Sequence, residues 1–171
     1  MYKISMVWIC LAVILQAVNV GDTLPHVTLE KENGGMSHDK PWYSKTLRGK
    51  VHLLLYMDPD KRAENQALLD ALNVLEVDSQ KYSTVAIVNL AATWMPDAIL
   101  EGLLSKKEKE LKNTSFVFDK KKYLVKKWKM KDDASNVWII DRTSKVMYKK
   151  VGKASHEEIE YMIKMLSDML K

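Results

Sequence analysis

Asp58 and Asp60 directly follow the apolar run of residues 51–57 (VHLLLYM). Such a run is typical of a strand buried on both faces, and α/β folds place functional side chains at the carboxyl ends of their strands. Paired carboxylates at that place could transfer protons or hold a cation. The alternative is a helix start, with Asp58 as N-cap, Pro59 in the first helical position and Asp60 beside the positive helix end. We favour capping, because it accounts for each of these residues.

The sequence contains one cysteine, Cys10, which lies inside an apolar N-terminal segment. Residues 1–17 have the layout of a secretory signal peptide: a positive charge at Lys3, an apolar run, and a small residue, Ala17, after which we expect cleavage. The apolar run is shorter than the roughly 20 residues that span a bilayer, so we expect no transmembrane span in the mature protein. The mature chain would have no cysteine, hence no disulfide, no cysteine nucleophile and no thiolate ligand. We expect a periplasmic location.

Other catalytic and cofactor motifs are missing from the sequence. The four histidines have no spacing typical of a metal site, and the six glycines form no phosphate-binding loop. No G-x-S-x-G elbow for a serine nucleophile occurs. We therefore predict no catalytic residue, no metal and no cofactor. The histidines are His26, His38, His52 and His156.

A run of lysines occupies residues 120–131, interleaved with Tyr123, Trp128 and Met130. A basic and aromatic surface would suit an anionic partner such as lipid headgroups, an envelope polymer or an acidic protein. The pattern also suits single-stranded nucleic acid, but we expect no nucleic-acid partner for an exported protein. The alternative, which we favour, is a solvated surface strand whose lysines prevent edge-to-edge association. The candidate binding residues of this run are Lys120, Lys121, Lys122, Lys126, Lys127, Trp128, Lys129 and Lys131.

Strands and helices are predicted to alternate along the chain. After the strand at 51–57, Leu68 and Leu72 fall on one stripe of a helix that begins at Pro59. A second helix is expected to start at residues 96–97. Further extended segments are expected at residues 84–91, 115–119, 123–128, 137–141 and 145–151, the last two forming a hairpin.

The last helix has the clearest start signal. In a capping box, the Ser155 hydroxyl and the Glu158 side chain would each satisfy a free backbone N–H. The order is then β–α–β–α–β, a β-hairpin and a C-terminal helix. Alternation of this kind implies parallel strands with helices on the sheet faces, so we expect an α/β fold in one domain, residues 18–171.

This order resembles the thioredoxin arrangement, and short motifs support the likeness. Gly21-Asp22-x-x-Pro25, residues 47–51 (LRGKV) and residues 137–141 (VWIID) resemble segments of thioredoxin-like periplasmic proteins. More specifically, the chain is similar to the YtfJ family of small exported bacterial proteins, through residues 49–51 (GKV), residues 87–89 (IVN) and the closing helix. The resemblance implies a thioredoxin-like fold, with a central mixed sheet flanked by helices, and export. It implies no established chemistry.

Two departures separate the sequence from the thioredoxin-like enzymes. Residues 58–61 (DPDK) hold the place of the Cys-x-x-Cys turn, and disulfide exchange requires a thiolate. Ser135 lies near the position of the cis-proline that helps to present substrate, and a non-proline peptide bond is overwhelmingly trans. We therefore expect neither thiol oxidoreductase nor thiol peroxidase activity. Ser135 joins Asp58 and Asp60 as a candidate binding residue of this face.

The predicted function is a redox-inactive, non-catalytic binding or accessory module for a polypeptide or an anionic envelope component. One alternative is an enzyme with non-thiol chemistry at Asp58 and Asp60. Such an enzyme would have a cleft in which the two carboxylates face each other without accepting hydrogen bonds from helix N–H groups. A second alternative is a regulatory protein, against which the signal peptide and the lack of a recognisable helix-turn-helix argue.

Overall fold

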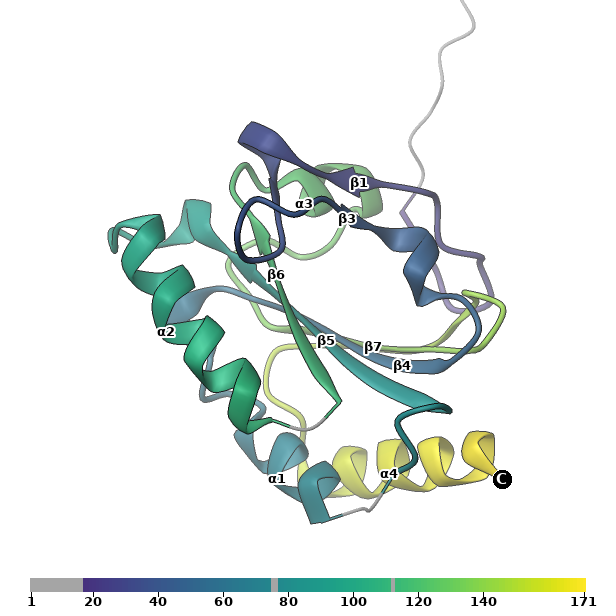
Figure 1. Cartoon of the computed structure of the whole chain (residues 1–171). Helices are drawn as coiled ribbons and strands as arrows, with labels where there is room; N and C mark the ends of the chain where they lie inside the picture. The colour runs from purple at the N-terminus through teal and green to yellow at the C-terminus, as the bar shows by residue number, and fades with distance from the viewer. Residues whose placement is uncertain (1–16, 75–76, 112) are drawn as a thin grey trace, which may run out of the picture.

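A computed structural model describes residues 17–171 except residues 75, 76 and 112 (Figure 1). The predicted signal peptide, residues 1–17, lies outside the described residues apart from Ala17, so its removal stays a prediction. Among the described residues, Val18 is the first with a buried side chain. Within the described part of the chain, no helix combines the length and apolarity needed to cross a bilayer.

The centre of the molecule is a mixed sheet of six strands in the order β2-β6-β5-β4-β7-β8. β4, β5 and β6 run parallel, whereas β2, β7 and β8 are antiparallel to their neighbours. β4 lies between β5 and β7 and is buried from Val51 to Tyr56, which explains its nearly continuous apolar sequence. The strands are β2 (Gly34–Gly35), β4 (Val51–Met57), β5 (Tyr82–Asn89), β6 (Thr114–Asp119), β7 (Asn136–Ile140) and β8 (Val146–Val151).

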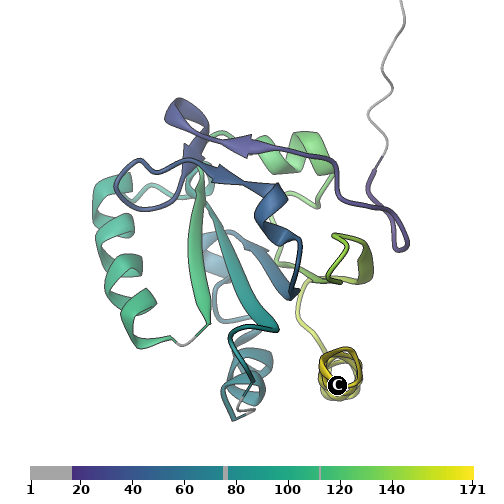
Figure 2. The same cartoon turned by 45° about the vertical axis from the view of Figure 1, so that its right-hand side comes forward.

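Helices cover both faces of this sheet (Figure 1, Figure 2). One face carries α1 (Gln66–Val74), α2 (Asp97–Glu110) and α4 (His156–Leu170). The other carries α3 (Tyr123–Trp128) and a two-stranded sheet. That sheet and the short 3-10 turns are β1 (Thr28–Leu29), β3 (Trp42–Tyr43), η1 (Lys31–Asn33), η2 (Ser44–Leu47), η3 (Pro59–Lys61) and η4 (Leu90–Ala92).

The predicted order of the main elements is confirmed, including the closing hairpin and the capping box of Ser155 and Glu158. Two local predictions are wrong. The helix after β4 does not begin at Pro59: a 3-10 turn comes first, and α1 starts at Gln66. Residues 123–128 form α3 rather than an extended segment.

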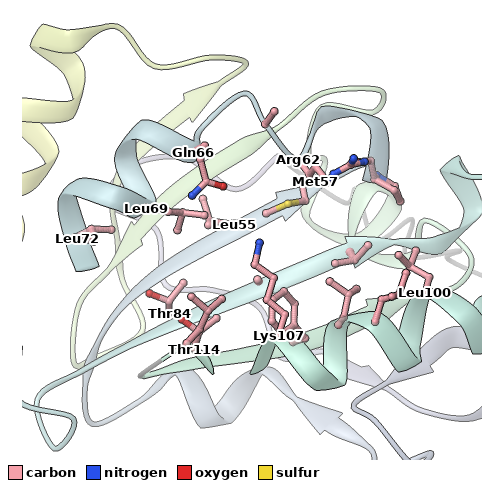
Figure 3. Close-up of a pocket in the computed structure, with 18 of the residues that line it drawn as sticks. Leu55, Met57, Arg62, Gln66, Leu69, Leu72, Thr84, Leu100, Lys107 and Thr114 are labelled. Atoms are coloured by element: carbon pink, nitrogen blue, oxygen red, sulfur yellow. The ribbon is translucent and has the colours of Figure 1, made fainter. Parts of the chain in front are cut away.

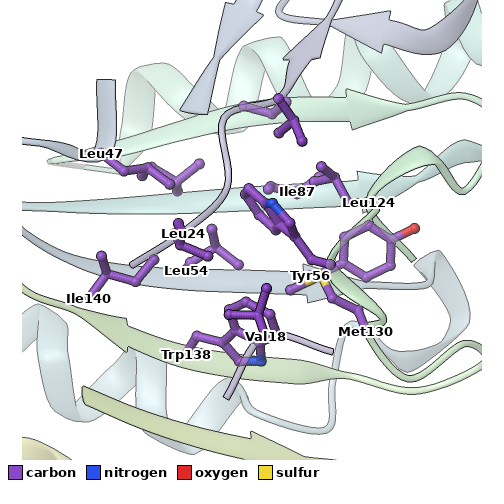
Figure 4. Close-up of a cluster of buried hydrophobic side chains, with 14 of the residues drawn as sticks. Val18, Leu24, Leu47, Leu54, Tyr56, Ile87, Leu124, Met130, Trp138 and Ile140 are labelled. Atoms are coloured by element: carbon purple, nitrogen blue, oxygen red, sulfur yellow. The ribbon is translucent and has the colours of Figure 1, made fainter. Parts of the chain in front are cut away.

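The core beneath α3 is built around Trp128, which is fully buried. Its ring stacks on Trp138, with centroids 5.9 Å apart, and meets the ring of Trp42 edge-on at 6.3 Å. Its indole N–H donates to the backbone oxygen of Pro25 at 3.1 Å. Figure 4 shows Val18 beside Trp138 in the same cluster. Trp128 is therefore a core residue, and the prediction that its ring belongs to a binding surface is wrong.

α3 forms because of Asp119, the last residue of β6, whose side chain is completely buried. Its Oδ1 accepts the backbone N–H groups of Lys121 and Tyr123, and its Oδ2 accepts the N–H of Leu124 at 2.9 Å. The Tyr56 hydroxyl donates to the same Oδ2 at 3.3 Å. The first N–H groups of any helix have no partner within the helix. At the start of α3, the carboxylate of Asp119 supplies the acceptor for these groups.

Replacement of Asp119 with alanine should destabilise the protein strongly, because it leaves buried N–H groups and the Tyr56 hydroxyl without their acceptor. We expect the free energy of unfolding to fall by about 3 kcal/mol or more. Urea unfolding followed by tryptophan fluorescence measures this. Asp60→Ala is the control: the side chain is exposed, and its loss should change stability by no more than about 0.5 kcal/mol. Equal unfolding midpoints for Asp119→Ala and the wild type would contradict the assigned role.

His52 places an ionisable ring inside β4. The ring is buried, and neither of its nitrogens has a hydrogen-bond partner among the described residues. Burial, aided by the positive charge of Lys50, lowers the pKa of His52 from 6.5 to about 4. The folded state therefore holds the neutral ring at a pH where the unfolded chain already binds a proton.

Because the folded pKa of His52 lies below the unfolded pKa, stability should fall as the pH drops from about 6.5 to about 4 and the loss should level off below that. Across this window, protonation of His52 should lower the free energy of unfolding by about 3 kcal/mol in total. Urea unfolding at a series of pH values should show a smaller loss over this window for His52→Leu than for the wild type. Parallel pH profiles for the two proteins would exclude His52 as the cause.

Candidate functional site

Three polar side chains meet where the parallel strands end. Asp58 follows β4, Asn89 ends β5 and Asp119 ends β6, and all three are buried. This edge is where open α/β sheets place their sites. Asn89 Nδ2 donates to Asp58 Oδ1 at 2.6 Å, whereas Asn89 Oδ1 has no hydrogen-bond partner among the described residues.

Asp58 is not the side-chain N-cap that the sequence predicts. Its carboxylate makes no capping hydrogen bond, because it turns inward to Asn89, and only its backbone oxygen serves the turn, by accepting the N–H of Lys61. Burial raises the pKa of Asp58, while the hydrogen bond from Asn89 acts in the opposite direction. A buried carboxyl group of this kind could act as a proton donor.

Asp60 does not supply the second half of an acid–base pair. Its side chain is exposed and lines the cleft described below, whereas Asp58 is held against Asn89. The facing carboxylates that would indicate an enzyme with non-thiol chemistry are thus not formed. The described residues also contain no group of three histidine, cysteine, aspartate or glutamate side chains that could hold a metal ion.

Ser135 lies in a closed hydrogen-bond network around Asn65. Asn65 Nδ2 donates to Ser135 Oγ at 2.8 Å and to the backbone oxygen of Gly152 at 3.3 Å. Asn65 Oδ1 accepts the N–H of Ala154 at 3.0 Å. Both side chains are buried, and no peptide bond in the described residues is cis. The network ties the chain before α1 to the start of β7 and to the loop before α4, so Ser135 offers its hydroxyl inward.

The predicted lysine run divides into paired and unpaired cations. Lys120 forms an ion pair with Glu101 at 3.0 Å, and Lys122 forms one with Asp132 at 2.9 Å. Lys127 lies over the Tyr123 ring, 5.5 Å from its centroid. The remaining lysines are exposed and have no ion pair with any described residue: Lys121, Lys126, Lys129 and Lys131.

Helix geometry explains where these lysines point. Leu124 and Trp128, four residues apart, form the buried stripe of α3. Lys126 lies between them in sequence and therefore on the opposite side of the helix, and Lys129, directly after the helix, is also exposed. The prediction of a surface strand that prevents edge pairing is wrong, because residues 123–128 form a helix packed on the sheet and the flanking lysines belong to no strand. We call Lys121, Lys126, Lys129 and Lys131 the α3 lysines.

A cleft of about 1090 Å³ separates α1 from α2 on the other face of the sheet. Its floor consists of β4, β5 and β6, and its walls are the two helices (Figure 3). The cleft exists because Thr84 and Ala86 of β5 are small, while the larger side chains pack to either side. One apolar cluster joins α1 and α4, and another joins α2 and β6. Met57 packs against both clusters.

Charged groups line the cleft at both ends and at its centre. Asp60 lies in the 3-10 turn η3, Arg62 directly follows that turn, and Asp78 lies in the loop before β5. The side chain of Asp78 accepts the N–H of Gln80 at 2.8 Å. Lys107 extends from α2 across the cleft toward Leu55 and Met57 (Figure 3).

Sequence reasoning missed this cleft, although signals for it exist. On α2, Leu100 is buried but Leu103 is 53% exposed, and Trp94, just before the helix, is 91% exposed. The exposed side chains of Leu103 and Trp94 both line the cleft. Exposed large apolar side chains of this kind mark binding surfaces when they adjoin a cavity, but that relation becomes visible only when α2 is placed beside β5.

The chain is similar to a family of bacterial proteins described as of unknown function, YtfJ_HI0045, whose model matches residues 13–169. An uncharacterized protein of Haemophilus influenzae is 26% identical over 138 residues, which cover 77% of this chain and 73% of the relative. The uncharacterized protein YtfJ of Escherichia coli is 25% identical over 140 residues, with the same shares covered.

Solved structures show the fold. A candidate thiol:disulfide interchange protein DsbE of Chlorobium tepidum has a TM-score of 0.63 at 18% identity, covering 91% of this chain and 100% of that chain. The exposed lipoprotein thioredoxin Etrx1 of Streptococcus pneumoniae has a TM-score of 0.56 at 15% identity, covering 83% and 100%. These likenesses confirm the predicted thioredoxin-like fold. Residues 18–171 contain no cysteine, so no Cys-x-x-Cys pair accompanies it.

Asn65→Ala should destabilise the protein, because the Ala154 N–H loses its acceptor and the Ser135 hydroxyl loses its donor. We expect the free energy of unfolding to fall by about 2 kcal/mol, measured by urea unfolding. Asn73→Ala, on the exposed side of α1, is the matched control and should leave stability unchanged within about 0.5 kcal/mol. If the two variants unfolded at the same urea concentration, the Asn65 network would not hold this face together.

Proposed function

The chain belongs to the YtfJ_HI0045 family of bacterial proteins of unknown function, and from that premise we propose a function for its own surface. The protein is an exported, periplasmic binding module without thiol chemistry, and its partner is an anionic component of the cell envelope. The observation that carries this proposal is the set of α3 lysines, which are exposed and have no ion pair with any described residue.

The turn and loop of the former redox site support binding rather than catalysis. Residues 58–61 offer no thiol, and their one buried carboxylate is hydrogen-bonded to Asn89. The Ser135 hydroxyl is bonded to Asn65, and its backbone oxygen accepts the N–H of Gly152 at 2.7 Å. Because these groups are used internally, a polypeptide partner at this face has less support than an anionic partner at α3.

The charge on α3 suits a membrane surface or another anionic layer. Lysines near an anionic lipid surface each contribute roughly 1 kcal/mol to binding, and they act together. The burial of Leu124 and Trp128 fixes the helix, so that Lys126 projects away from the core, and Lys129, directly after the helix, is exposed as well. A positive patch held in this way loses little freedom when it binds, which favours association.

Export rests on the signal-peptide pattern of residues 1–17. Two further observations support it. Val18, directly after the predicted cleavage site, is the first buried side chain among the described residues, and one structural neighbour is named as an exposed lipoprotein. Intact mass spectrometry of the periplasmic fraction tests this step: the protein should accumulate there without residues 1–17.

Binding to vesicles tests the partner. Protein purified in the form that accumulates in cells should sediment with vesicles that contain phosphatidylglycerol, and it should do so less at high salt, where charges are screened. Lys126→Glu/Lys129→Glu should weaken binding about tenfold or more, because two attractive charges become repulsive. The control Lys153→Glu/Lys164→Glu changes the net charge equally, and Lys164 lies on α4, on the opposite face of the sheet.

The two double variants separate a binding patch from an overall charge effect. The control should bind the anionic vesicles within about threefold of the wild type, given that distant surface charges act weakly. Failure of the wild-type protein to bind at low salt, or equal weakening by both double variants, would refute the proposal.

A further inference from the structure

We propose that the cleft between α1 and α2 binds a single-chain amphiphile with an anionic head group, such as a long-chain carboxylate. This site lies on the opposite face of the sheet from the α3 lysines and does not depend on them. The proposal rests on the shape of the cleft, on the apolar character of its walls and on one cation.

The cleft has the size and the shape of a site for an extended chain. Its volume of about 1090 Å³ is slightly above the range for small-molecule sites, roughly 300–1,000 Å³. It follows β5 from Tyr82 to Val88, six residue steps, which is about 20 Å at the usual rise of a strand. One leaflet of a membrane, about half of the roughly 30 Å hydrocarbon core, has a similar depth. An acyl chain of membrane length would therefore fit along β5.

The walls are apolar along most of this length. α1 contributes Leu69 and Leu72, and α2 contributes Leu100, Leu103 and Leu104. On the floor, the hydroxyl of Thr84 is hydrogen-bonded to the Tyr82 hydroxyl at 2.9 Å. Hydrocarbon that covered Thr84 would therefore leave this hydroxyl with a hydrogen-bond partner. Hydrocarbon in this space would gain the transfer free energy of each buried methylene without leaving a protein polar group unpaired there.

Lys107 supplies the charge that selects an anionic head. Its side chain extends over the apolar floor, and its ammonium group has no ion pair or hydrogen bond with any described residue. Of the two carboxylates that line the cleft, Asp78 accepts the N–H of Gln80, and Asp60 is exposed at the turn after β4; neither forms an ion pair with Lys107. An anionic head bound to Lys107 would form a charge-assisted hydrogen bond in a partly apolar setting.

Trp94 lies at the mouth of the cleft and gives a signal for binding. It is 91% exposed and lines the cleft, whereas Trp42, Trp128 and Trp138 are buried in the core beneath α3. A bound chain that covers Trp94 should shift its fluorescence to shorter wavelength, and the buried tryptophans should contribute little to this change.

The first experiment is calorimetric titration of the cell-derived protein with myristate below its micelle concentration, with Trp94 fluorescence recorded in parallel. Methyl myristate is the uncharged match, and lysophosphatidic acid with the same chain offers a phosphate head. We expect both anionic ligands to bind and the methyl ester to bind about tenfold more weakly or not at all. The tighter of the two anionic ligands identifies the head group.

Variants locate the ligand within the cleft. Lys107→Glu should weaken myristate binding about tenfold or more, whereas Lys106→Glu, the next residue of α2 and not part of the lining, should bind as the wild type does. Ala86→Leu fills the floor and should abolish binding; circular dichroism checks that this variant folds. If Ala86→Leu does not fold, the Lys106 and Lys107 pair still decides the question.

Three results would overturn the proposal. They are no binding of either anionic ligand to the wild type, equal binding of myristate and its methyl ester, and equal weakening by Lys106→Glu and Lys107→Glu. The test is independent of the function proposed above. Lys126→Glu/Lys129→Glu should retain myristate binding, and Lys107→Glu should retain vesicle binding, so either proposal can fail alone.

Discussion

The buried carboxylate of Asp119 determines how the chain folds between β6 and β7. Because it accepts the N–H groups of Tyr123 and Leu124, the chain turns into a helix as soon as β6 ends. The helical period then directs Leu124 and Trp128 inward and Lys126 outward. The tryptophan core and the basic surface of α3 are therefore two results of one set of hydrogen bonds.

The elements that could be predicted from the sequence are those whose signals are local. The buried strand β4 shows a continuous apolar run, and the capping box that starts α4 spans only four residues. α3 has no such signal: its six residues are too few to show a helical period, and the groups that start it belong to the end of a strand. Trp128 was accordingly placed on the surface, although its position in the helix buries it completely.

The candidate site shows the same limit over longer distances. Asp58 has every local mark of an N-cap, yet its carboxylate bonds Asn89, which is 31 residues away. Ser135 was singled out by resemblance, but its partner Asn65 is 70 residues away. The cleft depends on small side chains in β5 and on the spacing of two helices, and none of these is informative alone. Pairings between distant segments cannot be read from the pattern of either segment.

Because residues 18–171 contain no cysteine, function in this fold has to use other groups than a Cys-x-x-Cys pair. At the strand ends, polar groups remain, but Asp58, Asn65 and Ser135 are bonded within the protein. Among the described residues, the exposed cations that have no ion pair include the α3 lysines and Lys107, which lies above the apolar floor of the cleft. Binding through charge and enclosed apolar volume needs no reactive side chain. A thioredoxin-like sheet without thiols can therefore support recognition on both of its faces, because the helices that cover the sheet, rather than the strand ends, present the charges.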